Sequence, residues 1–352
     1  MASQKKQHEE PYPILYGEDL SESLPPVRWV SEGLGITAGA VTIIGGAGFG
    51  GKTVSMQSLA LSVASGQPIW GQHPIAQGVA LHIDYEQGRR LTQDRYQRLA
   101  KSLRVNLKDL SHNIRAVCLP RAHLCDLGAE IHLARLCEGV TIAIVDAFRG
   151  AFPTANENDS EARKWLDMLH DVSVKTGCAM AVIAHSRKST DDEGVRASLR
   201  GSSALFDAAQ SVYMLDGETG KPTRVHHTKD RVLGKTKPTF GLRISDEPHL
   251  DDPRWGLRVD YMDPGSVRDA YDAPSTDELT ASAARLTSMG ERVLALVTTD
   301  GTAASMLRSM VGGSATDLRA VLDSLVESGS IHREGKGSDA MYRRYREPGD
   351  EG

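Results

Sequence analysis

One glycine-rich segment constrains this chain more than any other. Residues 46–53, Gly-Ala-Gly-Phe-Gly-Gly-Lys-Thr, fit the pattern G-x-x-x-x-G-K-[ST] at every fixed position. An apolar run at residues 40–44 precedes it, and a helical pattern that begins at Val54 follows it. In this setting the glycines let consecutive backbone N–H groups surround phosphate oxygens, and the helix N-terminus adds positive potential. The segment therefore predicts a nucleotide-phosphate site, a P-loop, rather than a chance glycine-rich turn.

Each part of the P-loop has an expected role. The Lys52 ammonium group is suited to neutralise phosphate charge, and the Thr53 hydroxyl is suited to bind Mg²⁺. The expected cofactors are therefore ATP and Mg²⁺. The expected cofactor-binding residues are Gly46, Ala47, Gly48, Phe49, Gly50, Gly51, Lys52, Thr53 and Val54.

Short apolar runs alternate with helical patterns from residue 36 to about residue 261, which predicts an α/β domain with a mainly parallel sheet. Four runs are apolar almost throughout, as expected for strands that helices cover on both faces. These runs are residues 40–44, 79–83, 140–145 and 179–184. From residue 225 onward, apolar and polar residues alternate, which is typical of antiparallel strands that complete such a sheet.

A polar residue or a glycine follows each of the four runs: Gly45, Asp84, Asp146 and His185. Ligands of open α/β sheets bind at the carboxyl ends of the strands, so we expect these four segments to meet at one edge. Asp146 is expected to join Thr53 in holding Mg²⁺, as a Walker B carboxylate. His185 is a candidate to sense the γ-phosphate or orient water, with a structural hydrogen bond as the alternative.

Glu86 is the candidate for the group that polarises the attacking water. It follows the run at residues 79–83, and we expect that strand to lie beside the P-loop strand. A carboxylate there can act as a general base if it comes within hydrogen-bond reach of the water. From the residues alone, Asp84 is an equal alternative, and a surface position in a loop is the other interpretation of Glu86.

The order of these motifs resembles that of the RecA-like ATPases, over residues 27–244. Residues 83–86, Ile-Asp-Tyr-Glu, look like the segment that bears the catalytic glutamate of that family, which favours Glu86. The closest resemblance is to the plasmid RepA-type hexameric replicative helicase group. It is carried by Asn-Glu-Asn-Asp at 156–159, His-Ser-Arg-Lys at 185–188 and Arg-Gly-Ser-Ser-Ala-Leu at 200–205. The chain departs from that group in its Gly-Phe-Gly at 48–50 and in its C-terminal module.

This resemblance implies a homo-oligomer, a ring of six in the helicase group, with ATP at the subunit interfaces. Lys229 and Arg231 are similar to the Lys-x-Arg pair that reaches the γ-phosphate bound by the neighbour, where an arginine stabilises transition-state charge. A turn with solvated charges is the alternative for these two residues.

The same resemblance implies that the loop after His185 faces a central pore, where its cations would contact DNA, most simply a single strand. The expected contacts are Arg187, Lys188, Arg196 and Arg200. Acidic residues at 191–193 dilute this charge, so a plain solvated loop is the alternative. The formal net charge of −5 also argues against binding nucleic acid through bulk charge.

The sequence divides into four parts. We expect a flexible N-terminal arm at 1–26, the ATPase core at 27–263, a linker at 264–281 and a small module at 282–346. Three helical patterns followed by two strands make the module winged-helix-like, with Ser314 and Asp317 capping its third helix. Arg319 and the cations of the wing could hold duplex DNA, and a protein partner is the alternative.

We therefore expect an α/β RecA-like P-loop core with a small C-terminal winged-helix domain. The expected function is an ATP-hydrolysing motor on DNA, a helicase or translocase in replication or a related DNA transaction. A recombinase-like filament former and a regulatory ATPase switch are the alternatives. The longest uncharged apolar stretch, residues 40–51, is too short to cross a bilayer, and the N-terminus lacks the apolar core of a secretory signal. We expect a cytoplasmic protein without a membrane partner.

Overall fold

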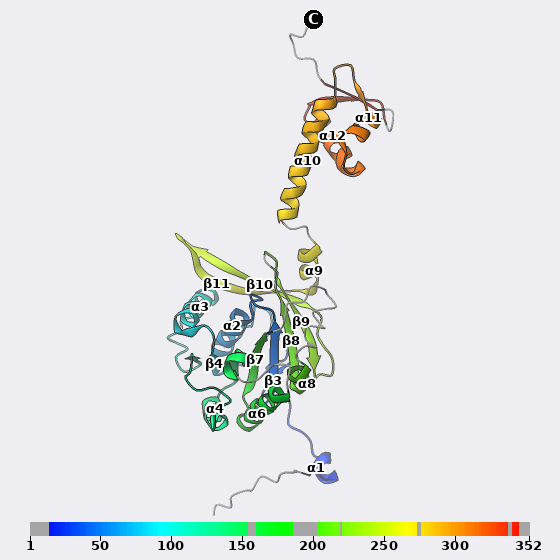
Figure 1. Cartoon of the computed structure of the whole chain (residues 1–352). Coiled ribbons are helices and arrows are strands. Elements are labelled where there is room, and N and C mark those ends of the chain that lie inside the picture. The colour runs from blue at the N-terminus through cyan, green and yellow to red at the C-terminus, as the bar shows by residue number, and fades with distance from the viewer. Residues whose placement is uncertain are drawn as a thin grey trace, which may run out of the picture. The chain divides into compact units, whose positions relative to one another are not determined.

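The computed structural model describes residues 14–153, 160–185, 203–218, 220–272, 276–336 and 340–344. The chain divides into two compact units, Met1–Ala270 and Tyr271–Gly352. The first unit contains a nine-stranded sheet with helices on both faces (Figure 1). The second unit is smaller and combines helices with a three-stranded sheet.

The large sheet has the strand order β11-β10-β9-β8-β3-β7-β6-β4-β5. Its parallel part consists of β3 (Val41–Gly46), β4 (Ala80–Asp84), β5 (Ile114–Cys118), β6 (Ile142–Asp146), β7 (Ala179–His185) and β8 (Ser211–Asp216). Three antiparallel strands complete it: β9 (Thr223–Asp230), β10 (Phe240–His249) and β11 (Asp252–Met262). The predicted fold class, a mainly parallel sheet that ends in antiparallel strands, is confirmed.

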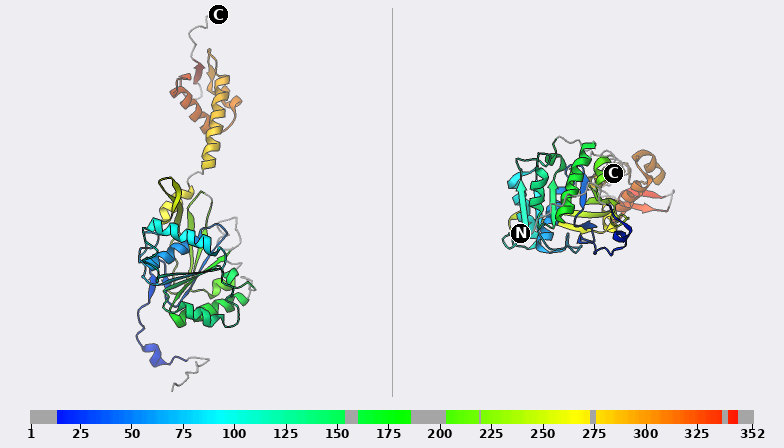
Figure 2. Two further views of the ribbon diagram at one scale, coloured as in Figure 1. Left: turned by 90° about the vertical axis from the view of Figure 1, so that its left-hand side faces the viewer. Right: turned by 90° about the horizontal axis from the view of Figure 1, so that it is seen from below.

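Helices cover both faces of this sheet (Figure 2). A separate apolar core lies between the helices and the sheet on each face. On one face lie α2 (Lys52–Ser65) and α3 (Gly88–Leu103); on the other lie α4 (Ala129–Cys137), α5 (Phe148–Ala151), α6 (Ser160–Thr176) and α8 (Ser203–Ala208). Successive residues of one strand serve opposite faces, so Ile144 packs in the first core and Val145 in the second. This two-sided burial explains why the predicted strands are apolar almost throughout.

One expectation about strand order is wrong. The strand that leads to Glu86, β4, does not pair with the P-loop strand β3, because β7 and β6 lie between them. Apolar runs show which strands are buried, but the helical crossovers that set strand order leave no local pattern. The apolar pattern also gave no sign of β5, an edge strand whose central residues Arg115 and Ala116 are exposed.

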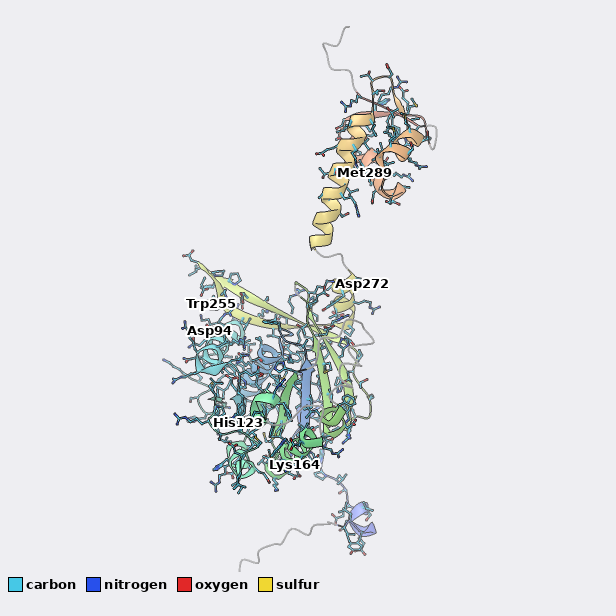
Figure 3. All side chains as sticks on the ribbon, in the orientation of Figure 1. Asp94, His123, Lys164, Trp255, Asp272 and Met289 are labelled. Carbon is cyan, nitrogen blue, oxygen red and sulfur yellow. The ribbon has the colours of Figure 1, made fainter. Side chains whose placement is uncertain are left out.

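The hairpin formed by β10 and β11 is fastened to α3. The buried Arg98 of α3 pairs with Asp246 on β10, and its Nη2 donates to the carbonyl oxygen of Gly256 on β11 at 3.0 Å. Figure 3 shows Trp255 of the hairpin and Asp94 of α3 at the same side of the unit. The position of α3 is therefore tied to the hairpin as well as to the sheet.

The C-terminal unit is built from helices and short strands. Its elements are α10 (Thr276–Leu296), β12 (Thr302–Ala303), α11 (Ala304–Val311), α12 (Ala315–Glu327), β13 (Ile331–Glu334) and β14 (Met341–Arg344). The antiparallel sheet has the order β12-β14-β13. Met289, labelled in Figure 3, packs with Leu307 and Ile331 in one apolar core. The predicted cap of α12 is present, since Ser314 Oγ accepts a hydrogen bond from the backbone N–H of Asp317 at 3.0 Å.

Two further segments lie outside the cores just described. The range 264–281, predicted as a linker, carries α9 (Pro264–Asp272) and the beginning of α10. The described part of the N-terminal arm contains α1 (Gly17–Ser21), and every residue from 14 to 28 is exposed. The arm leads into a small ribbon of β1 (Trp29–Ser31) and β2 (Ile36–Thr37). Within the described ranges, no helix combines the length and the apolar character that a bilayer-spanning segment requires.

Candidate active site

The P-loop has the strand–loop–helix geometry that its sequence predicts. Strand β3 ends at Gly46, and α2 begins at Lys52. Gly46 has a φ of 149°, and a Cβ there would lie 2.2 Å from the carbonyl oxygen of Leu215 on β8. Gly51 has a φ of 74°, and its Cβ would lie 2.3 Å from Cδ1 of Ile244 on β10. Both positions therefore require glycine, for the backbone conformation and for the close approach of neighbouring strands.

The ammonium group of Lys52 lies inside the loop that it serves. Its Nζ donates hydrogen bonds to the carbonyl oxygens of Gly46, at 2.8 Å, and Ala47, at 2.6 Å. The side chain is buried, while Val54 in the same helix turn packs against the apolar core. Phe49, by contrast, is fully exposed and holds a left-handed φ of 65°. The loop thus keeps its cation at the base of the phosphate site and an aromatic ring at its surface.

The carboxylate of Asp84, the alternative to Glu86, is hydrogen-bonded to the backbone turn that follows β4. Its Oδ1 accepts from the N–H groups of Glu86 (2.9 Å) and Gln87 (2.8 Å), and its Oδ2 from that of Gly88 (3.0 Å) and from the Thr92 hydroxyl (2.5 Å). Burial raises the pKa of Asp84, but these hydrogen bonds outweigh it and hold the pKa below its ordinary value. Asp84 therefore shapes the turn.

Glu86 projects from this turn toward the end of another strand. Its Oε1 lies 2.9 Å from Nε2 of His185, the last residue of β7, and both side chains are partly exposed. The hydrogen bond from His185 lowers the pKa of Glu86; burial opposes this effect, and the charges of His185 and Lys52 add to it. The structure therefore brings Glu86, His185 and the P-loop lysine to the same edge of the sheet, as predicted, and keeps the Glu86 carboxylate ionised near neutral pH.

Asp146 ends β6 at the same edge, in register with Asp84 of β4. It is fully buried, and neither carboxylate oxygen has a hydrogen-bond partner among the described residues. A buried carboxylate without a hydrogen-bond partner is costly, so this site suits a cation and its bound water. The residues present therefore fit Mg²⁺, with the Thr53 hydroxyl at the start of α2 as the second protein group.

Two residues around Asp146 were not singled out from the sequence. His82, buried in β4, has its Nε2 3.5 Å from Oδ2 of Asp146. Arg95 of α3 donates a hydrogen bond to the side chain of Gln87. Burial lowers the pKa of Arg95, and the charges of Asp146 and Asp84 offset part of this shift. A histidine inside an otherwise apolar run was a visible signal for His82, whereas Arg95 looked like one of many surface arginines of its helix.

Residues late in the chain complete the outer wall of the P-loop. Thr223, the first residue of β9, donates a hydrogen bond to the carbonyl oxygen of Gly50 at 3.4 Å. Gly217 lies so close that an added Cβ would be 3.0 Å from Cα of Gly50. These contacts join segments about 170 residues apart, and no local sequence pattern could have indicated them.

The predicted pair Lys229 and Arg231 lies at the other end of the strands. Lys229 is opposite Val212, near the start of β8, whereas the P-loop packs against the end of β8. The Lys229 ammonium group donates to the carbonyl oxygens of Phe206 (2.5 Å) and Asp207 (2.9 Å), and Arg231 Nη2 also donates to that of Asp207 (2.5 Å). Burial lowers the pKa of Lys229, and the charge of Arg231 lowers it further, to about 8. The pair is therefore remote from the P-loop of its own chain.

Several predicted residues lie outside the described part of the chain. They are the four candidate DNA contacts Arg187, Lys188, Arg196 and Arg200, and the segment at 156–159. Their roles remain predictions.

Most of the core region matches a known family of sequences. The sequence pattern of the AAA domain family matches residues 8–191, just over half of the 352 residues. No curated protein matches the chain. Among solved structures, a crystal structure of the RadB recombinase is similar, with a TM-score of 0.43 and 14% sequence identity; the similarity covers 63% of this chain and 91% of that one. A P-loop at the end of a central parallel strand and a family match over this region lead to one conclusion: the chain belongs to the AAA domain family and has a P-loop ATPase core built on a mainly parallel sheet.

Proposed function

We propose that this protein is an oligomeric ATP-hydrolysing motor that acts on DNA. One observation carries the proposal: Lys52, Glu86 and Asp146 meet at the carboxyl ends of the parallel strands. The carboxylate of Asp84, by contrast, accepts hydrogen bonds from the backbone turn after β4. This is the set of groups that phosphoryl transfer to water requires: a phosphate cation, a base and a metal-binding carboxylate.

Within this site each side chain has a distinct part. Lys52 and the N–H groups at the start of α2 would bind the β- and γ-phosphates. Glu86 would take a proton from the attacking water, and His185 would hold the Glu86 carboxylate in place through their 2.9 Å contact. Thr53 and Asp146 would hold Mg²⁺, which supplies neutralisation of the phosphate charge.

The assembly part of the proposal rests on Lys229 and Arg231. These residues lie at the ends of the strands that are opposite the P-loop, so they could reach a γ-phosphate only in another subunit. A ring or filament would place them there, as the resemblance to the hexameric helicase group implies. An arginine supplied in this way stabilises transition-state charge and can raise the rate by about 10³-fold or more.

The C-terminal unit supports a docking role in the same proposal. Its order of helix, strand, two helices and two strands supports the proposal of a winged helix, in which α12 would be the recognition helix. Three of its candidate phosphate contacts already pair with acidic groups of the unit: Arg319 and Arg333 with Asp323, and Arg343 with Glu334. Duplex DNA would have to compete with these pairs, so we favour a protein partner for this unit.

One measurement tests the proposal directly. The steady-state ATPase rate of the purified chain would be measured with and without single-stranded DNA, at low and moderate salt. A DNA-coupled motor predicts strong stimulation that weakens as salt rises, because phosphate contacts release counterions. A slow rate that is indifferent to DNA would instead favour the regulatory switch, and filaments seen on single-stranded DNA by electron microscopy would favour the recombinase-like alternative.

A further inference from the structure

Three buried polar side chains form a cluster at the end of β6. They are Asp146 itself, His82 of β4 and Tyr96 of α3. Nε2 of His82 lies 3.5 Å from Oδ2 of Asp146. The rings of His82 and Tyr96 meet edge to face, with their centroids 5.9 Å apart. We refer to these three residues as the Asp146 cluster.

The polar atoms of the Asp146 cluster lack hydrogen-bond partners. Among the described residues, neither carboxylate oxygen of Asp146, neither ring nitrogen of His82 and no atom of the protein with the Tyr96 hydroxyl makes a hydrogen bond. A buried polar group without such a partner is costly and calls for an explanation. So many of them in one place indicate a cluster whose hydrogen bonds are completed in another state of the site.

Donors and acceptors within the cluster are complementary. An ionised Asp146 only accepts hydrogen bonds, whereas an N–H group at Nε2 of His82 and the hydroxyl of Tyr96 can both donate. Burial raises the pKa of Tyr96, and the charge of Asp146 raises it further, so the hydroxyl keeps its proton at neutral pH. This influence of the Asp146 charge also places the hydroxyl within electrostatic reach of the carboxylate.

The fold holds both donors in place. His82 lies inside β4, which pairs with β5 on one side and with β6 on the other. Tyr96 lies on α3 between two anchors of that helix. The Thr92 hydroxyl donates to the carboxylate of Asp84 at the end of β4, and Arg98 donates to a backbone carbonyl of β11. The two donors therefore approach from the sheet and from the helix that covers it.

We propose that His82 and Tyr96 are positioning residues for the metal site: they donate to one oxygen of Asp146 and leave the other to face Mg²⁺ and its bound water. From 3.5 Å, a shift of a few tenths of an ångström brings Nε2 of His82 within hydrogen-bond distance. Contacts of this kind are often long until the ligand binds. The inference rests on the part of the proposed function that assigns Asp146 to Mg²⁺.

These contacts should matter to metal affinity more than to phosphate binding. Groups that hydrogen-bond to a metal-binding carboxylate fix its orientation, and removing one typically weakens metal binding by about 10- to 100-fold. The phosphate-binding groups, Lys52 and the N–H groups at the start of α2, are separate from the cluster. Metal-free nucleotide binding should therefore stay unchanged when a donor to Asp146 is removed.

The first experiment removes the donor on α3. Mn²⁺ serves as the probe for the Mg²⁺ site, because electron paramagnetic resonance measures the free ion directly. In the full-length chain with one equivalent of ADP, Tyr96→Phe keeps the ring and should bind Mn²⁺ about tenfold more weakly or worse. Tyr213→Phe is the matched control, since it removes a buried hydroxyl that donates to the carbonyl oxygen of Leu34, and it should bind Mn²⁺ like the unchanged chain.

A second set of variants tests the donor on β4. His82→Leu removes the N–H group, whereas His82→Gln keeps an amide N–H near the position of Nε2. We expect His82→Leu to lose about tenfold or more in Mn²⁺ affinity and His82→Gln to recover part of that loss. His227→Leu, at a buried histidine of β9, is the control and should leave the Mn²⁺ affinity unchanged.

Denaturant unfolding without metal separates positioning from packing. The Tyr96 hydroxyl makes no hydrogen bond to the described residues, so Tyr96→Phe should keep or raise the unfolding midpoint. Tyr213→Phe loses a hydrogen bond and should lower the midpoint. A purely structural role for Tyr96 would give the reverse result, a lower midpoint with unchanged Mn²⁺ affinity, and would overturn the inference.

Hydrolysis and binding together distinguish this inference from the proposed function. Tyr96→Phe should need about tenfold more Mg²⁺ for its half-maximal rate, with little change in kcat at saturating Mg²⁺. Unchanged Mn²⁺ affinity in Tyr96→Phe or in His82→Leu would overturn the role given to that residue and leave Asp146 as the metal ligand. If the unchanged chain bound no Mn²⁺ with ADP, the proposed function would fail, and this inference with it.

Discussion

The carboxylate of Glu86 lies 2.9 Å from Nε2 of His185, although the two residues are 99 positions apart and come from strands that do not pair. Between β4 and β7 runs β6, which ends at the buried Asp146. The Glu86–His185 contact therefore bridges the end of the strand that carries the candidate metal ligand. The direction of the candidate base is therefore set by a residue of β7.

Replacing Glu86 by glutamine should lower the ATPase rate by about 10²- to 10⁴-fold, because the water loses its base. ATP affinity should change little, since the phosphate-binding groups of the P-loop are untouched. Steady-state hydrolysis and the binding of a fluorescent ATP analogue measure the two effects. Glu138→Gln, at an exposed glutamate, is the matched control. Normal turnover by Glu86→Gln would show that another group is the base.

Asp84→Ala should mainly lower the free energy of unfolding. The substitution removes the acceptor of four hydrogen bonds and leaves buried donors unpaired, so we expect a loss on the order of 3 kcal/mol in the free energy of unfolding. Denaturant unfolding measures this loss. Asp109→Ala, at an exposed aspartate, should unfold like the unchanged chain, and an unaltered midpoint for Asp84→Ala would contradict the role assigned to the turn.

The same carboxylate predicts a pH dependence of stability. Burial raises the pKa of Asp84, but the hydrogen bonds prevail and the folded-state pKa lies below the ordinary value. The contribution of Asp84 is therefore complete at neutral pH and is lost as the pH falls from about 4 through the folded-state pKa. Unfolding curves across this range should show a steeper loss of stability for the unchanged chain than for Asp84→Ala.

His185→Ala should move the acidic limb of the pH–rate profile to higher pH. The hydrogen bond from His185 is the main cause that lowers the pKa of Glu86, so its removal lets that pKa rise. Because the base acts when ionised, half-maximal kcat/KM would then occur at a higher pH. His112→Ala, at an exposed histidine, is the control. A fall in rate with no shift of the limb would mean that His185 acts by other means.

Arg231→Ala and Lys52→Ala should each abolish most hydrolysis, yet mixtures of the two should regain part of it. In an equal mixture, about a quarter of the interfaces would pair an intact P-loop with an intact Arg231. ATPase assays over a range of mixing ratios test this expectation. Arg115→Ala, at an exposed arginine of β5, is a suitable control. Activity that never exceeds the sum of the two separate variants would count against a finger supplied by the neighbour.

The sequence predicted the parts of this protein that are encoded locally. The P-loop pattern, the apolar runs of the buried strands and the cap at Ser314 each depend on residues within a few positions of one another, and the structure contains all three. Edge strand β5 was missed for a physical reason. A strand with one exposed edge and a half-covered face has no need of a continuous apolar run.

The sequence by itself therefore determined which chemical groups are available: a phosphate loop, carboxylates and a histidine at strand ends, and a basic pair late in the core. Tertiary structure decided how these groups are used. Strand order placed β6 and β7 between β3 and β4, directed Glu86 to His185 and turned Asp84 inward. It also carried Lys229 and Arg231 to the opposite edge. Local propensity depends on neighbours along the chain, whereas strand order depends on how the helices pack across the whole sheet, so only the folded chain reveals it.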